Sequence, residues 1–217
     1  MFRQMAAAAV LLAAAPSAAW ACVPDGMAKI VTRWVTPGID PKSMGAQQKT
    51  SYRMTLRHAR IEEPRNPVTG VQGMMVVNEP DIWIVDRAKN TGQHAIDPGP
   101  VLEIRAPLFS WRDTPPAFQT LELGCEKAFL DAYAPKPQGE AVVDGVRLAR
   151  HQVSVGQDRI EILMRGDGRP YTAAYYKGDV TRLVIRYDQY LTGLPADMSL
   201  FSKPPGVAFT EAPTPAN

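Results

Sequence analysis

The sequence predicts a mainly β protein, built as a curled antiparallel sheet or incomplete barrel with two or three short helices. Two observations in the last third of the chain support this class. The four runs 146–155, 159–165, 171–176 and 181–191 are rich in strand-forming residues, and a period of two places Ile160, Ile162 and Met164 on one side of their strand. Glycines separate these runs, and Asp144-Gly145 and Asp167-Gly168 are dipeptides typical of tight hairpin turns. Regular short strands with turn signals between them predict an antiparallel meander.

The first 21 residues have the pattern of a secretory signal peptide. Arg3 precedes an apolar run over residues 5–15, and Ala19 and Ala21 are the small residues that signal peptidase requires. The run is shorter than the ~20 apolar residues that cross a bilayer. An N-terminal core helix is the alternative. We therefore expect a signal peptide over 1–21, one β-rich domain over 22–210, a disordered tail over 211–217, and a periplasmic or secreted protein.

Cys22 becomes the first residue of the exported chain and has three possible roles: a disulfide, a lipid anchor or a free thiol. Bacterial lipoprotein signals carry a Leu-like residue three places before the cysteine, where this chain has Ala19. The other cysteine is Cys125, and an even count in an exported chain favours a disulfide between Cys22 and Cys125. Such a bridge closes a loop of about 100 residues and stabilises by roughly 4 to 5 kcal/mol in the chain-entropy model.

Charge and hydropathy argue against nucleic-acid binding and against a membrane-spanning segment. Without the signal peptide the chain carries 23 basic and 22 acidic side chains, so no basic surface for nucleic acid is indicated. No second apolar run approaches spanning length, which predicts no transmembrane segment.

The first half of the chain mixes both periodicities. Residues 25–35 carry apolar residues at helical spacing after Asp25, a possible cap, and predict a short amphipathic helix. A loop over 36–45 follows, with two prolines and two glycines. Residues 52–60 then alternate with a period of two, which places Met54 and Leu56 on one side of a strand.

The middle of the chain predicts a hairpin and one more helix. Strands are expected over 73–77, 81–86 and 93–97, with the turn residues Asn90 and Gly92 before the last of them. Residues 101–107 predict another strand, and 110–118 a proline-broken loop. Helical spacing from Cys125 predicts a short helix over 125–133.

Motifs for catalysis or cofactor binding are absent from the sequence. His58, His94 and His151 lie far apart without a second ligand at metal-binding spacing, so we expect no metal. There is no G-x-S-x-G elbow, P-loop or G-x-G-x-x-G. We expect no enzyme and no cofactor; a hydrolase with an acidic residue near His151 is the remaining catalytic alternative. Five tyrosines suggest either a recognition surface or, more simply, cross-strand aromatic pairs: Tyr171, Tyr175, Tyr176, Tyr187 and Tyr190.

Two segments resemble a known family. The ending YYKGDVTRLVIRYDQYLTGLPADMSLFSKPPGVAFTE, residues 175–211, and the hairpin GMMVVNEPDIWIVDRAKNTGQHAID, residues 73–97, are similar to the periplasmic lipoprotein carriers of the LolA-like family. The resemblance implies a curled sheet covered by helices around an apolar cavity for acyl chains. The stretch 98–137 has no counterpart in that family.

The resemblance implies a carrier, binding protein or chaperone for lipid or lipoprotein acyl chains. Such a site needs no motif, because each buried methylene contributes about 0.8 kcal/mol. The alternative is an envelope interaction module with a fully packed core and a protein partner. The expected cavity lining is the apolar inner face of the strands: Met54, Leu56, Ile160, Ile162, Met164, Leu183, Ile185 and Tyr187.

Overall fold

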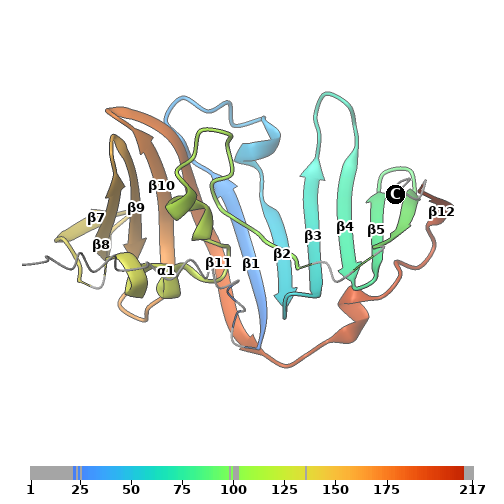
Figure 1. The fold of residues 1–217 in the computed structure, drawn as a ribbon. Helices are drawn as coiled ribbons and strands as arrows, with labels where there is room; N and C mark the ends of the chain where they lie inside the picture. Colours follow the sequence, from blue (N-terminus) through green and yellow to red (C-terminus); the bar gives the residue numbers. More distant parts are fainter. Residues whose placement is uncertain are drawn as a thin grey trace, which may run out of the picture.

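The protein folds as one curled sheet of twelve strands. The computed structural model describes residues 22, 24, 26–97, 99, 103–134 and 136–212. Within them the strand order is β12-β6-β5-β4-β3-β2-β1-β11-β10-β9-β8-β7 (Figure 1). All neighbouring strands pair antiparallel except β12 and β6, which run parallel. In this part of the chain β7 and β12 form the two edges, so the sheet does not close. The mainly β, curled antiparallel class is confirmed.

The strand boundaries follow the alternating patterns closely in the second half of the chain. The strands are β1 Met27–Trp34, β2 Lys49–Met54, β3 His58–Arg65, β4 Gln72–Asn78, β5 Asp81–Asp86, β6 Thr91–Ile96, β7 Glu140–Val143, β8 Val146–Val155, β9 Asp158–Met164, β10 Pro170–Lys177, β11 Val180–Leu194 and β12 Ala208–Glu211. The predicted meander is therefore present as β8 to β11. The β7–β8 turn is formed by Asp144 and Gly145, both with positive φ, as hairpins with this dipeptide require.

The helix predicted over residues 25–35 is wrong, because this segment forms strand β1. It pairs with β2 on one side and with β11 on the other, up to the pair Trp34 and Ile185. Its apolar residues fit a helical period as well as a strand, and the β-branched Ile30, Val31 and Thr32 favour the strand. Long-range pairing decides between the two, since a strand inserted between two others satisfies its whole backbone.

The single strand predicted over residues 52–60 is also wrong. The chain reverses at residues 55–57, between β2 and β3. Thr55 adopts a positive φ of 65°, and its hydroxyl accepts a hydrogen bond from the Arg57 amide at 3.1 Å. A side-chain oxygen thus stabilises a turn that has neither glycine nor proline.

Helices are fewer than expected. The described residues contain one α-helix, α1 (Glu126–Tyr133), which confirms the helix predicted from Cys125, and three short 3₁₀ turns, η1 (Met44–Ala46), η2 (Pro116–Thr120) and η3 (Met198–Phe201). Residues 103–107 join no strand of the sheet, contrary to the strand predicted over 101–107; Pro107 forms one isolated bridge, to Glu122. Residues 101 and 102 lie outside the described part.

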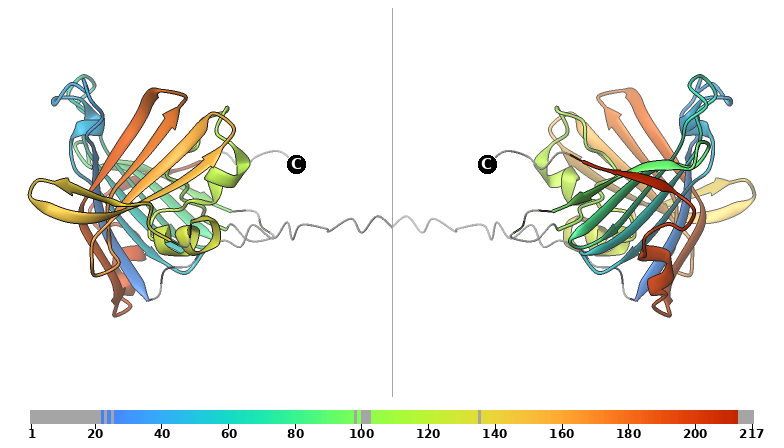
Figure 2. Two further views of the ribbon diagram at one scale, coloured as in Figure 1. Left: turned by 90° about the vertical axis from the view of Figure 1, so that its left-hand side faces the viewer. Right: turned by 90° about the vertical axis from the view of Figure 1, so that its right-hand side faces the viewer.

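The inner face of the sheet is the one that packs against residues 103–125, which we call the covering segment, and against α1. Figure 2 shows the sheet curled with these elements on its inner side. The main hydrophobic core lies between them and strands β1 and β8 to β11, where Phe109, Phe118, Leu121 and Phe129 bury their side chains against the sheet. This half of the inner face is therefore solidly packed.

The outer face carries a smaller core closed by the C-terminal residues. Met74, Val76, Trp83 and Val85 form it, and Val207 and Phe209 pack on them. Phe201 of η3 lies edge-on to His58, with ring centroids 5.6 Å apart. Glu211, placed in the tail by the sequence, is the last residue of β12. The expected signal peptide over 1–21 and residues 213–217 of the expected tail lie outside the described residues.

Candidate ligand-binding groove

An apolar groove of about 430 Å³ opens on the inner face, between the sheet and the covering segment. Strands β1 to β4 and β11 form one wall, and residues 104–111 with Leu123 form the other. In Figure 1 this green part of the chain runs in front of β1, β2 and β11. The lining is Thr32, Trp34, Lys49, Ser51, Arg53, Ala59, Ile61, Met75, Ile104, Arg105, Ala106, Pro107, Leu108, Ser110, Trp111, Leu123, Leu183 and Ile185.

Alternation along the strands explains the floor of the groove. Ser51 and Arg53 on β2, Ala59 and Ile61 on β3, and Met75 on β4 all point to the inner face. Ser51 and Ala59 are small and lie next to Ile61, Ser51 as its partner on β2 and Ala59 two residues before it on β3, so they leave space above the sheet beside Ile61. The groove has the size of a small-molecule site and the predominantly apolar lining such sites have.

Two tryptophans line the groove and remain partly exposed. Trp34 is 47% exposed and Trp111 is 37% exposed, although large aromatic side chains gain most from burial. Trp111 stacks on Tyr175 with ring centroids 5.5 Å apart. Both indole rings therefore keep apolar surface that a ligand can cover.

A second hollow of about 600 Å³ continues from the groove. It shares Thr32, Trp34 and Lys49 with the groove and extends under the loop that includes η1. Gly45 in this loop packs on the Trp34 ring so closely that a Cβ atom there would overlap with the ring. The glycine thus allows the loop to cover one face of Trp34.

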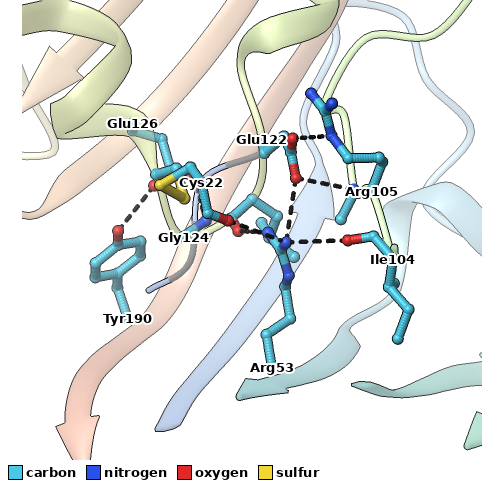
Figure 3. Close-up of a disulfide and its surroundings, with 11 residues drawn as sticks. Cys22, Arg53, Ile104, Arg105, Glu122, Gly124, Glu126 and Tyr190 are labelled. Carbon is cyan, nitrogen blue, oxygen red and sulfur yellow. Dashed lines mark hydrogen bonds and ion pairs between the residues drawn. A yellow bond between two sulfur atoms is a disulfide. The ribbon is translucent and has the colours of Figure 1, made fainter. Parts of the chain in front are cut away.

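A buried ion cluster joins the sheet to the covering segment at the groove (Figure 3). Arg53 of β2 donates to Glu122 Oε2 at 3.1 Å, and Arg105 Nε donates to Glu122 Oε1. Glu122 is fully buried. Arg53 also donates to the carbonyls of Leu123, Cys22 and Ile104 at 2.6, 3.4 and 3.5 Å. These bonds satisfy a buried guanidinium that would otherwise be costly.

The disulfide between Cys22 and Cys125 lies beside this cluster (Figure 3). It links the chain just before β1 to the start of α1, across 103 residues of sequence. The sequence predicted this bridge from the cysteine count. It anchors the end of the covering segment next to Arg53.

A second buried carboxyl group lies on the other side of the disulfide. Glu126 accepts hydrogen bonds from the Tyr187 hydroxyl at 2.7 Å, the Tyr190 hydroxyl at 2.8 Å and the Gly124 amide at 3.0 Å. Complete burial raises the pKa of Glu126, although these hydrogen bonds act in the opposite direction. Burial next to Glu126 also raises the pKa of Tyr187.

The residues predicted to line an acyl cavity fall into three places. Leu183 and Ile185 line the groove. Four others are buried in the packed core beneath the covering segment and α1: Ile160, Ile162, Met164 and Tyr187. Met54 alternates with the inward-pointing Arg53, and Leu56 lies in the β2–β3 turn. Contact of these residues with acyl chains stays a prediction.

Sequence reasoning missed most of the groove. Trp34 was assigned to a helix, and Ile61 and Met75 carried no signal beyond their apolar character. Met54 was predicted to face inward, whereas its neighbour Arg53 is the residue that lines the groove. Glu122, the partner of Arg53, is far away in sequence. The only local sign that Arg53 points inward is its spacing of two residues from Ser51, which also lines the groove.

The three histidines occupy separate environments. His151 Nδ1 lies 3.3 Å from the Ala134 carbonyl, His58 contacts the Thr55 hydroxyl at 2.9 Å, and His94 lies between Asp81 and Glu211. In the part of the chain that the structure describes, His, Cys, Asp and Glu side chains form no group of three able to hold a metal ion. No helix there is long and apolar enough to cross a membrane.

Comparisons with known proteins assign no family. No family model and no curated protein matches the chain. An uncharacterised conserved protein from Thermus thermophilus has a similar solved structure, with 12% identity, a TM-score of 0.46, and coverage of 87% of this chain and 91% of that one. A chain of the Pseudomonas aeruginosa MucA/MucB complex has 12% identity and a TM-score of 0.38, with 83% and 56% coverage. This chain thus spans just over half of the latter, and likeness at this level assigns no function.

Proposed function

We propose that this chain is an exported binding or carrier protein that holds an acyl chain of a lipid or lipoprotein in the groove. The observation that carries the proposal is the open apolar groove of about 430 Å³ between the sheet and the covering segment. The partly exposed Trp34 and Trp111 support it, since a hydrocarbon chain would cover apolar surface that the protein itself leaves open.

The energetics of such a site are favourable without specific polar contacts. Each methylene buried contributes about 0.8 kcal/mol, so a chain of ten methylenes gains ~8 kcal/mol before the costs of association. The similarity of residues 73–97 and 175–211 to the LolA-like carriers agrees with this role. The export pattern of residues 1–21 agrees with an envelope location. The proposal includes no catalysis and no cofactor.

Tryptophan fluorescence of the mature chain from Cys22 tests the proposal. Delipidated protein titrated with a saturated fatty acid below its micellar concentration should show a saturable change in emission. The change should be lost in a Trp34→Phe/Trp111→Phe variant and kept in Trp83→Phe, because Trp83 is buried in the outer-face core. Absence of any saturable change, with no lipid in native mass spectra of protein purified from cells, would refute it.

A groove-filling substitution provides the matched control. Ile61→Trp places a large side chain on the groove floor and should weaken fatty-acid binding at least tenfold. Val142→Trp adds the same side chain on the exposed edge strand β7, where Val142 is 69% exposed, and should leave binding unchanged. Equal binding by both variants would place the ligand elsewhere.

A second candidate is an envelope interaction module with no lipid ligand. It is favoured by the solid packing of the other half of the inner face, where Phe109, Phe118 and Phe129 fill the space over β8 to β11. The two candidates differ in one outcome. An interaction module binds no fatty acid, and Ile61→Trp would then change only stability.

A further inference from the structure

The charged side chains that line the groove are all basic. They are Lys49, Arg53 and Arg105, and no carboxylate is among the described residues that line the groove. A neutral hydrocarbon site needs none of them, because burying charge next to an apolar ligand is unfavourable. The positive sign of these charges therefore indicates a ligand that carries a negative charge.

Two of the three cations are neutralised or fully occupied by the protein. Lys49 forms an ion pair with Glu63 at 2.8 Å. Arg53 is buried and uses its Nη atoms on Glu122 and on three backbone carbonyls. Neither side chain offers an accessible donor with an unmatched charge.

Arg105 differs from both. Its Nε donates to Glu122, while Nη1 and Nη2 have no hydrogen-bonding partner among the described residues. Its side chain is 36% exposed, and Figure 3 shows its Nη atoms pointing away from Arg53. Glu122 balances only one charge and is shared with Arg53. Within the described part of the chain one positive charge therefore remains at the groove wall, on a guanidinium whose Nη atoms have no partner there.

We infer that the groove takes an anionic amphiphile whose carboxylate or phosphate is bound by the Nη atoms of Arg105. A guanidinium matches both anions through two parallel N–H donors. The hydrocarbon chain then lies along Ile61 and Met75 on the groove floor. The inference rests on the proposed function and names the class of ligand: an amphiphile with a single negative head group next to its acyl chain.

Four twelve-carbon ligands distinguish the contribution of the head group to binding from that of the hydrocarbon chain. Laurate and dodecyl phosphate should bind at least about tenfold more tightly than dodecanol, as one charge-assisted hydrogen-bond pair provides. Dodecyltrimethylammonium should bind more weakly than dodecanol. The tighter of the two anions identifies carboxylate or phosphate as the head group. Tryptophan fluorescence at low salt measures all four, and the preference should decline as salt is added.

Arg105→Gln tests the named residue, and Arg112→Gln is the control. Arg105→Gln should reduce the preference for laurate over dodecanol to less than about threefold, chiefly because laurate binding weakens. Glu122 keeps Arg53 as its partner in this variant. Arg112 lies in the same segment, is exposed and does not line the groove, so Arg112→Gln should keep the full preference.

The outcomes separate the two proposals. Binding of dodecanol as tight as that of laurate by the unmodified protein overturns the anionic head group but leaves acyl binding standing. A preference for laurate that survives in Arg105→Gln overturns the role of Arg105. If none of the four ligands binds, the acyl-binding function itself fails, and the inference fails with it.

Discussion

Arg53 Nη2 lies 3.1 Å from Glu122 Oε2, and this ion pair joins strand β2 to the segment that forms the opposite wall of the groove. Both side chains are almost completely buried. The pair therefore belongs to the structural support of the groove, whereas Arg105, bound to the other oxygen of Glu122, reaches the solvent side.

Removal of Arg53 should destabilise the protein strongly. Arg53→Met leaves Glu122 buried with only Arg105 and the Ala106 amide as partners. We expect the free energy of unfolding to fall by ~3 kcal/mol or more, as for other broken buried pairs. Arg105→Met, at the exposed end, should cost ~1 kcal/mol or less. Urea denaturation at neutral pH measures both losses. Equal losses would contradict the assignment of Arg53 to the structural support and of Arg105 to the groove surface.

A double variant distinguishes the loss of the pair from the loss of packing. Arg53→Met/Glu122→Leu removes both buried charges together. It should be more stable than Arg53→Met alone, because no uncompensated carboxylate remains. If the double variant is the less stable of the two, Glu122 stabilises the fold through its remaining hydrogen bonds, from Arg105 and from the Ala106 amide.

The disulfide should contribute substantially to stability. Cys22 and Cys125 are 103 positions apart in sequence, and the chain-entropy model gives about 4 to 5 kcal/mol for a loop of this length. A Cys22→Ala/Cys125→Ala variant should lose most of this amount in chemical denaturation. The unmodified protein should lose the same amount when a reductant is added, and the variant should not respond. A response of the variant to reductant would contradict this assignment.

Glu126 should make stability fall as pH rises above the mildly acidic range. Burial raises the pKa of Glu126 in the folded protein above its ordinary value of 4.5. At a pH between 4.5 and the folded-state pKa, the unfolded chain has therefore lost the proton that the folded protein keeps. Its contribution is thus fully present below 4.5 and is lost as pH rises through the folded-state pKa. In urea titrations the unfolding free energy of wild type minus that of Glu126→Gln should decrease over this window. A constant difference would exclude an elevated pKa.

His94 should hold the C-terminal strand more firmly at low pH. Its ring lies 2.7 Å from Asp81 and 2.9 Å from Glu211 of β12, and hydrogen bonds to these carboxylates raise the pKa of His94. The stabilisation is fully present below 6.5 and is lost as pH rises through the raised pKa. Trimming of the C-terminus by carboxypeptidase should therefore accelerate with pH in wild type relative to His94→Gln. Identical pH profiles would argue against this anchor.

Local sequence signals were sufficient for the meander and for the helix. The runs that form β8 to β11 are rich in strand-forming residues, and Asp144-Gly145 supplies the left-handed backbone that the β7–β8 turn needs. The spacing of Phe129 after Cys125 placed α1, in which Phe129 and Leu130 pack into the core. The cysteine count in an exported chain was sufficient to predict the bridge. In each case the physical cause lies within a few residues or in composition.

Only the tertiary structure decided the identity of β1, the turn at Thr55 and the groove. Residues 27–34 satisfy two periodicities, and the choice was made by pairing with residues of β11 that lie more than 150 positions away in sequence. Arg53 and Glu122 attract each other only after the covering segment crosses the sheet. The groove exists where that segment fails to fill the space above Ile61 and Met75. Alternation determines which side chains point inward, but whether other residues cover them depends on contacts between distant parts of the chain.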